Sequence, residues 1–146
     1  MGYQTAFLMI EGVSAAEAMD VFDSRFDAAD LFASPGEGIS FEEAASSFLH
    51  PNLALGETGG WAVFWDPSGG LVGSGFPAAA SKERRVFTGL LAGADSRYEC
   101  VWLVGGTEKP ALGQDEDSLF AAMARLTGVS FADLMGAAYR RLEFLG

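Results

Sequence analysis

The residues most suited to chemistry are four aspartates, spaced three, four and three positions apart. On a continuous helix this spacing places all four carboxylates along one stripe. The stripe could face solvent, bind a basic protein partner or hold a hard cation. An α-helix is a poor cage for Ca²⁺ or Mg²⁺, and the calcium-loop pattern is absent, so we expect no metal site. The four candidate partner-binding residues are Asp20, Asp23, Asp27 and Asp30.

A second candidate surface lies in the stretch WAVFWD, where Trp61 and Trp65 share one face of a predicted strand. Tryptophan is enriched at binding hot spots, so an uncovered face would suit a partner. The alternative is a strand inside the sheet, with apolar residues covered on both faces. Asp66 follows in the order Asp-Pro-Ser-Gly, which is typical of a type I turn and gives this carboxylate a structural role.

An enzyme or small-molecule-binding protein is the rival class. Its acid or base would be a carboxylate near the glycine-rich loops, namely Glu57, Asp66 or Glu99. His50 is the only histidine, which excludes a multi-histidine metal site. Cys100 is the only cysteine and lies in an apolar run, so we expect a buried, unreactive thiol. We therefore assign no catalytic residues, no metal and no cofactor.

Composition favours a single globular domain over residues 1–146, with 49% hydrophobic residues and a net charge of −11. Residues 1–79 contain eleven acidic residues and one basic residue, Arg25. This charge would repel nucleic acid and anionic membranes and attract a basic protein, although acidic surfaces also serve solubility. No apolar run reaches the ~18 residues of a membrane helix, and no basic segment precedes residues 6–10. We expect a cytoplasmic protein.

Helix starts are marked by Ser14 with Glu17, by Ser40 with Glu43 and by Ser130, because each serine can cap the amides of a first turn. Glycine and proline in SPGEG should end the first of these helices. The predicted helices cover 14–29, 40–50, 81–93, 117–128 and 130–140.

Strands are predicted at 3–11, 52–57, 61–66, 71–75 and 97–105, with a loop at 107–114 and a tail at 141–145 that frays or adds an edge strand. This order favours an α+β fold: an antiparallel sheet built from a meander with an N-terminal and a late strand, and helices mainly on one face. A basic cluster at 82–85 could meet the acidic half of a second copy, which would give a homodimer.

Three stretches occur in an order that resembles a family of small actinobacterial proteins of unknown function. They are AFLMIEGVSAAEAM, GETGGWAVFWDPSGGLVG and ARLTGVSFADLMGAAY. The Gly-Gly-Trp strand and the late Leu-Thr-Gly-Val segment are the most similar parts. The resemblance implies a further hairpin between the strand at 97–105 and the helix from 117, where this sequence predicts only a loop. It implies no catalytic residue.

Overall fold

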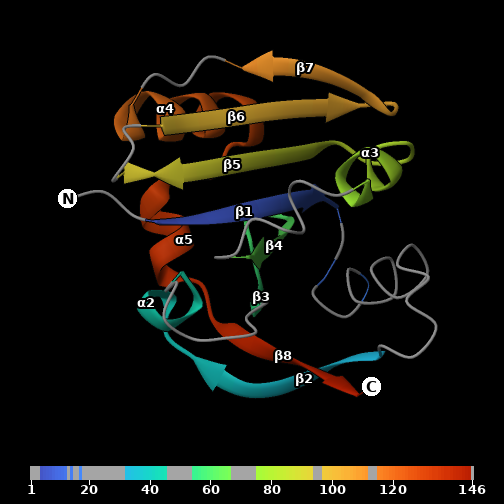
Figure 1. The fold of residues 1–146 in the computed structure, drawn as a ribbon, viewed down its shortest axis with the longest axis vertical. Helices are drawn as coiled ribbons and strands as arrows, with labels where there is room; N and C mark the ends of the chain where they lie inside the picture. Colours follow the sequence, from blue (N-terminus) through green and yellow to red (C-terminus); the bar gives the residue numbers. More distant parts are fainter. Residues whose placement is uncertain are drawn as a thin grey trace.

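The computed structural model describes residues 4–12, 14, 17, 32–45, 54–66, 75–93, 97–111 and 115–145. These residues form one open, eight-stranded antiparallel sheet with a few short helices (Figure 1). The strand order is β2-β8-β3-β4-β1-β5-β6-β7. The predicted α+β single-domain fold is therefore confirmed.

The strands are β1 (Gln4–Glu11), β2 (Phe32–Ile39), β3 (Ala54–Thr58), β4 (Trp61–Trp65), β5 (Val86–Ala92), β6 (Arg97–Val104), β7 (Thr107–Ala111) and β8 (Tyr139–Leu145). The helices are α2 (Phe41–Ala44), α3 (Phe76–Ala80), α4 (Glu116–Thr127) and α5 (Phe131–Gly136). Residues 71–74 of the predicted strand at 71–75 lie outside the described residues, and its last residue, Gly75, is the N-cap of α3.

Strand β1 lies in the middle of the sheet and is buried on both faces. Phe7 and Met9 point toward the side that carries α4 and α5, which lie behind the strands in Figure 1. Leu8 and Ile10 alternate with them toward the opposite side and are also fully buried. A strand covered on both faces reads as a continuous apolar run, as AFLMI does.

All three serine caps form the predicted hydrogen bonds. Ser14 Oγ accepts from the amide of Glu17, Ser40 Oγ accepts from the amide of Glu43, and both distances are 3.2 Å. Ser130 begins α5 with a reciprocal capping box. The helix α4 ends at Gly128, whose φ of 78° is the left-handed conformation that favours glycine.

The predicted helix at 81–93 is wrong, because residues 86–92 form β5. This strand pairs with β1 on one side and β6 on the other, with Thr88 opposite both Leu8 and Val101. The segment VFTGLL is therefore buried between two strands, and burial in the sheet overrides the apparent helical pattern. The predicted helix from Ser130 is correct at its start but ends at Gly136, short of Arg140.

The predicted loop at 107–114 is wrong over its first five residues. Residues 107–111 of the predicted loop form β7, joined to β6 by a two-residue turn in which Gly105 and Gly106 have φ of 61° and 81°. The SPGEG segment lies within β2, where the register shifts between Pro35 and Gly38, as in a β-bulge.

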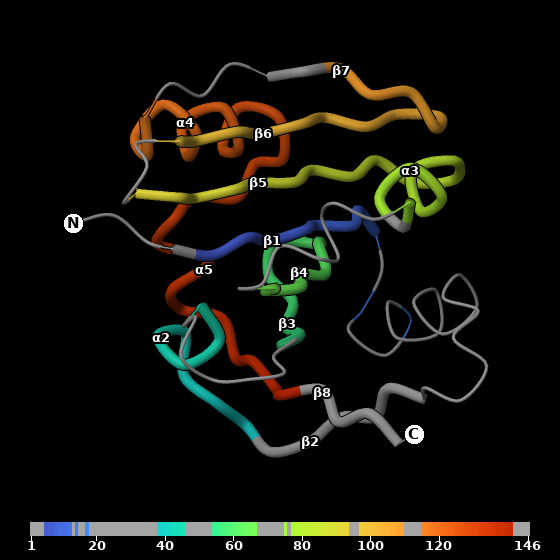
Figure 2. The backbone as a smooth tube through the Cα atoms, in the orientation of Figure 1, coloured from blue at the N-terminus to red at the C-terminus, as the bar shows by residue number. Residues whose placement is uncertain are grey.

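The tail is not frayed, because it belongs to β8, which pairs with β2 as far as Leu145. On its other side β8 pairs with β3 over residues 139–141, so this strand lies inside the described sheet and not at its edge. Figure 2 follows the backbone from α5 into this strand, which runs beside β3. The fit beside β3 is close: a Cβ on Gly56 would overlap the ring of Tyr139. The last strand of the chain thus fastens the β2 edge to the body of the sheet.

We predict that Gly89→Ala destabilises the protein by about 1–3 kcal/mol, because a Cβ there would overlap the ring of Phe7 in a tightly packed core. Urea denaturation measures the change in the free energy of unfolding. Gly136→Ala is the matched control: its Cβ would enter open space on ordinary backbone, and we expect a gain of about 0.4–1 kcal/mol. Equal midpoints for the two variants would contradict the packing argument.

Candidate functional site

The predicted aspartate stripe, at Asp20, Asp23, Asp27 and Asp30, lies outside the described residues. The two predicted tryptophans lie within them and are buried, Trp61 at 3% and Trp65 at 0% exposure. The sheet face on which they lie is covered, so neither ring is presented to a partner in this structure. Both side chains therefore fit the alternative of a strand inside the sheet, with its apolar residues covered.

Trp65 is enclosed by aromatic neighbours from three other elements. Its ring centroid lies 5.0 Å from that of Phe7 and 5.4 Å from that of Phe41. Tyr139 packs edge-on against it at 6.4 Å, and the Tyr139 hydroxyl donates a 2.7 Å hydrogen bond to the carbonyl of Leu134. Burial raises the pKa of Tyr139 to about 12. This hydroxyl therefore stays protonated and acts as a structural donor.

The carboxylates proposed for an enzyme do not converge. Asp66 is buried at the end of β4, and its amide donates to the carbonyl of Ala6. Glu99 lies in the same row across the sheet as Asp66, but on β6, three strands away. At ~4.8 Å per strand, the two residues are about 14 Å apart. Glu57 lies near the opposite end of the sheet, one residue before the last position of β3. Within the described ranges, no three His, Cys, Asp or Glu residues gather as metal ligands.

A different aromatic side chain is both structured and accessible. Trp102 on β6 is half-buried, and its ring centroid lies 6.1 Å from that of Trp61. The guanidinium carbon of Arg85 lies 5.5 Å from the Trp102 centroid, within cation–π range. We call Trp102, Arg85 and Glu11 the Trp102 cluster. The sequence pattern places Arg85 in a helix, far from any strand partner, and therefore does not predict this cluster.

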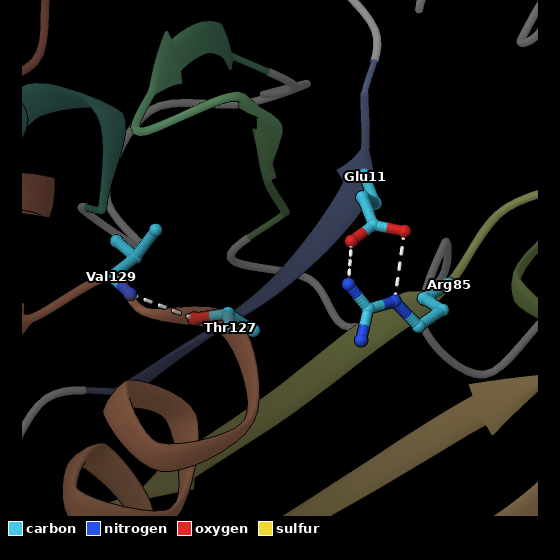
Figure 3. Close-up of polar contacts among 4 residues, drawn as sticks. All are labelled: Glu11, Arg85, Thr127 and Val129. Atoms are coloured by element: carbon cyan, nitrogen blue, oxygen red, sulfur yellow. Dashed lines mark hydrogen bonds and ion pairs between the residues drawn. The ribbon is translucent and has the colours of Figure 1, made fainter.

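Glu11 holds Arg85 in this position (Figure 3). Arg85 Nε donates to Glu11 Oε1 at 2.8 Å, and Arg85 Nη2 pairs with Glu11 Oε2. The hydrogen bond from Arg85 lowers the pKa of Glu11, and burial opposes this only in part. The fork–fork pairing fixes the plane of the guanidinium, which a single contact would leave free to rotate. Arg85 of the predicted basic cluster thus pairs within its own chain.

The Trp102 cluster draws its residues from the end of β1, the segment just before β5 and the last part of β6, and these strand ends lie on the same side of the sheet as α3 (Figure 1). The amide of Gly12 donates to the carbonyl of Gly60, which ties the end of β1 to the β3–β4 turn. The amide of Gly106 donates to Ser81 Oγ at 3.1 Å, which ties the β6–β7 turn to the segment before β5. These two hydrogen bonds, both donated by backbone amides, connect the chain reversals around the cluster. On the helix side, Thr127 Oγ1 accepts from the amide of Val129 (Figure 3).

Cys100 is buried, as predicted. Burial raises the pKa of its thiol, and the charge of Arg125 opposes that effect without overcoming it. A thiol with a raised pKa carries little of the reactive thiolate at neutral pH. Cys100 is therefore a packing residue of the helix-covered face.

No significant match to the chain is found among protein-family models, curated proteins or solved structures. None of the helices in the described ranges is long and apolar enough to span a membrane.

We predict that Glu11→Gln removes a pH-dependent part of the stability. Because the pKa of Glu11 is lower in the folded protein than its ordinary value of 4.5, the ionised carboxylate stabilises the fold. That contribution is complete above the unfolded pKa and is lost as the pH falls through the folded pKa. The difference in urea midpoint between wild type and Glu11→Gln should therefore shrink between pH 7 and pH 3.

Glu99→Gln is the matched control, because Glu99 pairs with Arg97 and both side chains are exposed, Arg97 at 60% and Glu99 at 55%. Solvent screens such a pair strongly, so we expect a smaller effect at pH 7 than for Glu11→Gln. An effect of Glu11→Gln that is the same at both pH values would show that the carboxylate charge is not what stabilises the fold.

Proposed function

We propose that this chain is a non-enzymatic interaction protein that binds a basic protein partner in the cytoplasm. The Trp102 cluster is the observation that carries the proposal. It combines tryptophan and arginine, two residue types that dominate binding energy at protein interfaces. It also lies on an accessible part of the sheet, where Trp102 is half-buried and Arg85 is exposed.

The cluster is held ready for binding by contacts within the chain. Trp61 lies behind the Trp102 ring, Arg85 covers it, and Glu11 fixes Arg85. A side chain that is already ordered loses little conformational entropy when a partner docks on it. The arrangement therefore supports a binding role as well as a contribution to stability.

The charge of −11 supports a basic partner, because opposite net charge steers association. Several described acidic side chains already have structural roles, including the helix caps Glu43, Asp115 and Asp133. We include in this proposal that the four predicted aspartates also contact the basic partner, beside the Trp102 cluster. An inhibitor or immunity protein against a basic toxin is one concrete form, by analogy with acidic proteins of that kind.

We predict that Trp102→Ala weakens the partner complex about 30-fold, which corresponds to the ~2 kcal/mol typical of a hot-spot truncation. The tagged chain is purified from its native host, a stoichiometric partner is identified, and its dissociation constant is measured with the purified protein. Circular dichroism and urea unfolding must show that the variant is folded.

Tyr98→Ala provides the matched control. Tyr98 is also half-buried and lies on the same face of β6, about 13 Å along the strand at ~3.3 Å per residue. It should change the dissociation constant by less than about threefold. Replacement of all four predicted aspartates by asparagine tests the charge component separately. A partner bound equally well by wild type and Trp102→Ala would overturn the assigned surface, and the lack of any stoichiometric partner would overturn the proposed function.

A further inference from the structure

Strand β7 is the last strand of the described sheet, and its outer side faces solvent. Thr107, Glu108 and Lys109 are all exposed. An exposed edge strand is a template for pairing with another chain, most simply a second copy. Whether a second copy can add there depends on which backbone groups of β7 point outward.

The turn between β6 and β7 settles this orientation. With positive φ at both Gly105 and Gly106, the connection is a two-residue type I′ hairpin. In such a hairpin the flanking residues, Val104 and Thr107, exchange both of their backbone hydrogen bonds. Hydrogen-bonded and non-hydrogen-bonded pairs then alternate along an antiparallel ladder.

From this alternation, Lys109 and Ala111 direct their backbone groups inward to Trp102 and Cys100. Glu108 and Pro110 belong to the alternate pairs, so their backbone groups point outward. Proline has no N–H. Between Thr107 and Ala111, Glu108 therefore offers the only outward amide.

We propose that Pro110 closes this edge against pairing with a second copy of the chain. In an antiparallel pairing with Glu108 opposite Pro110 of the second copy, each such pair would exchange one hydrogen bond where ordinary residues exchange two. That register also places Lys109 opposite Lys109 of the other copy, and like charges directly opposite are destabilising. The missing amide is the main barrier and the lysine charge adds to it.

If the chain forms the predicted homodimer, the two copies therefore do not meet through the β7 edge. This inference does not depend on the proposed function. Proline is tolerated in strands where its missing amide falls on an open edge. At position 110 the missing amide falls on the outer side, so β7 keeps its ladder to β6 but lacks one of the two outward amides that a further strand would pair with there.

The test compares Pro110→Thr, Lys109→Thr and the double variant by light scattering over a concentration series. Both single changes introduce threonine, a residue that favours strands, but only Pro110→Thr adds an outward amide. Hydrogen exchange followed by NMR reads the amides of residues 108 and 110 directly, which distinguishes edge pairing from a dimer through another surface.

We expect Lys109→Thr to behave as wild type and Pro110→Thr to self-associate. The double variant should self-associate at least about tenfold more tightly than Lys109→Thr. The amides of residues 108 and 110 should exchange rapidly in dilute Pro110→Thr and become protected at high concentration. The proposal is overturned if the double variant shows no edge protection at high concentration, or if Lys109→Thr alone associates through this edge as strongly as the double variant.

Discussion

A closed circuit of five aromatic rings is the interaction on which the rest of the structure depends. Starting at Phe7, it passes through Trp65, Phe41, Phe131 and Phe120 and returns to Phe7. Successive ring centroids are 5.0, 5.4, 5.6, 4.5 and 6.2 Å apart. The rings come from β1, β4, α2, α5 and α4, so one cluster joins the centre of the sheet to three helices. Each such pair adds about 0.5–1.5 kcal/mol beyond the burial of apolar area.

The circuit explains why the two tryptophans of β4 differ in their surroundings although they share a face. Trp65 is one of its members and is covered by Phe41 and Tyr139. Trp61 lies at the other end of the strand, where Trp102 continues the aromatic row toward the accessible surface. The two tryptophans are only four residues apart on one strand, yet Trp65 belongs to the deep core and Trp61 supports a candidate binding site.

Short sequence patterns predict the features that depend on a few neighbouring residues. The caps at Ser14, Ser40 and Ser130 are short-range hydrogen bonds, and all three form. The strand identity of β5 depends in part on β1, about 80 residues earlier, and the inner place of β8 depends on β2 and β3; the sequence patterns predict neither. The Trp102 cluster required Glu11 and Arg85 to meet across 74 residues, and no spacing rule in the sequence reveals such a contact.

The place of β8 has a consequence for the order of events during synthesis. β2 ends at Ile39, but the strand that joins it to β3 begins only at Tyr139. At ~5–20 residues per second, a ribosome needs about 5–20 s to make the intervening chain. During that time β2 has no neighbour from the described sheet to pair with. The nascent chain therefore carries an unfinished sheet while it is still being translated, and the final strand completes it only when it leaves the exit tunnel.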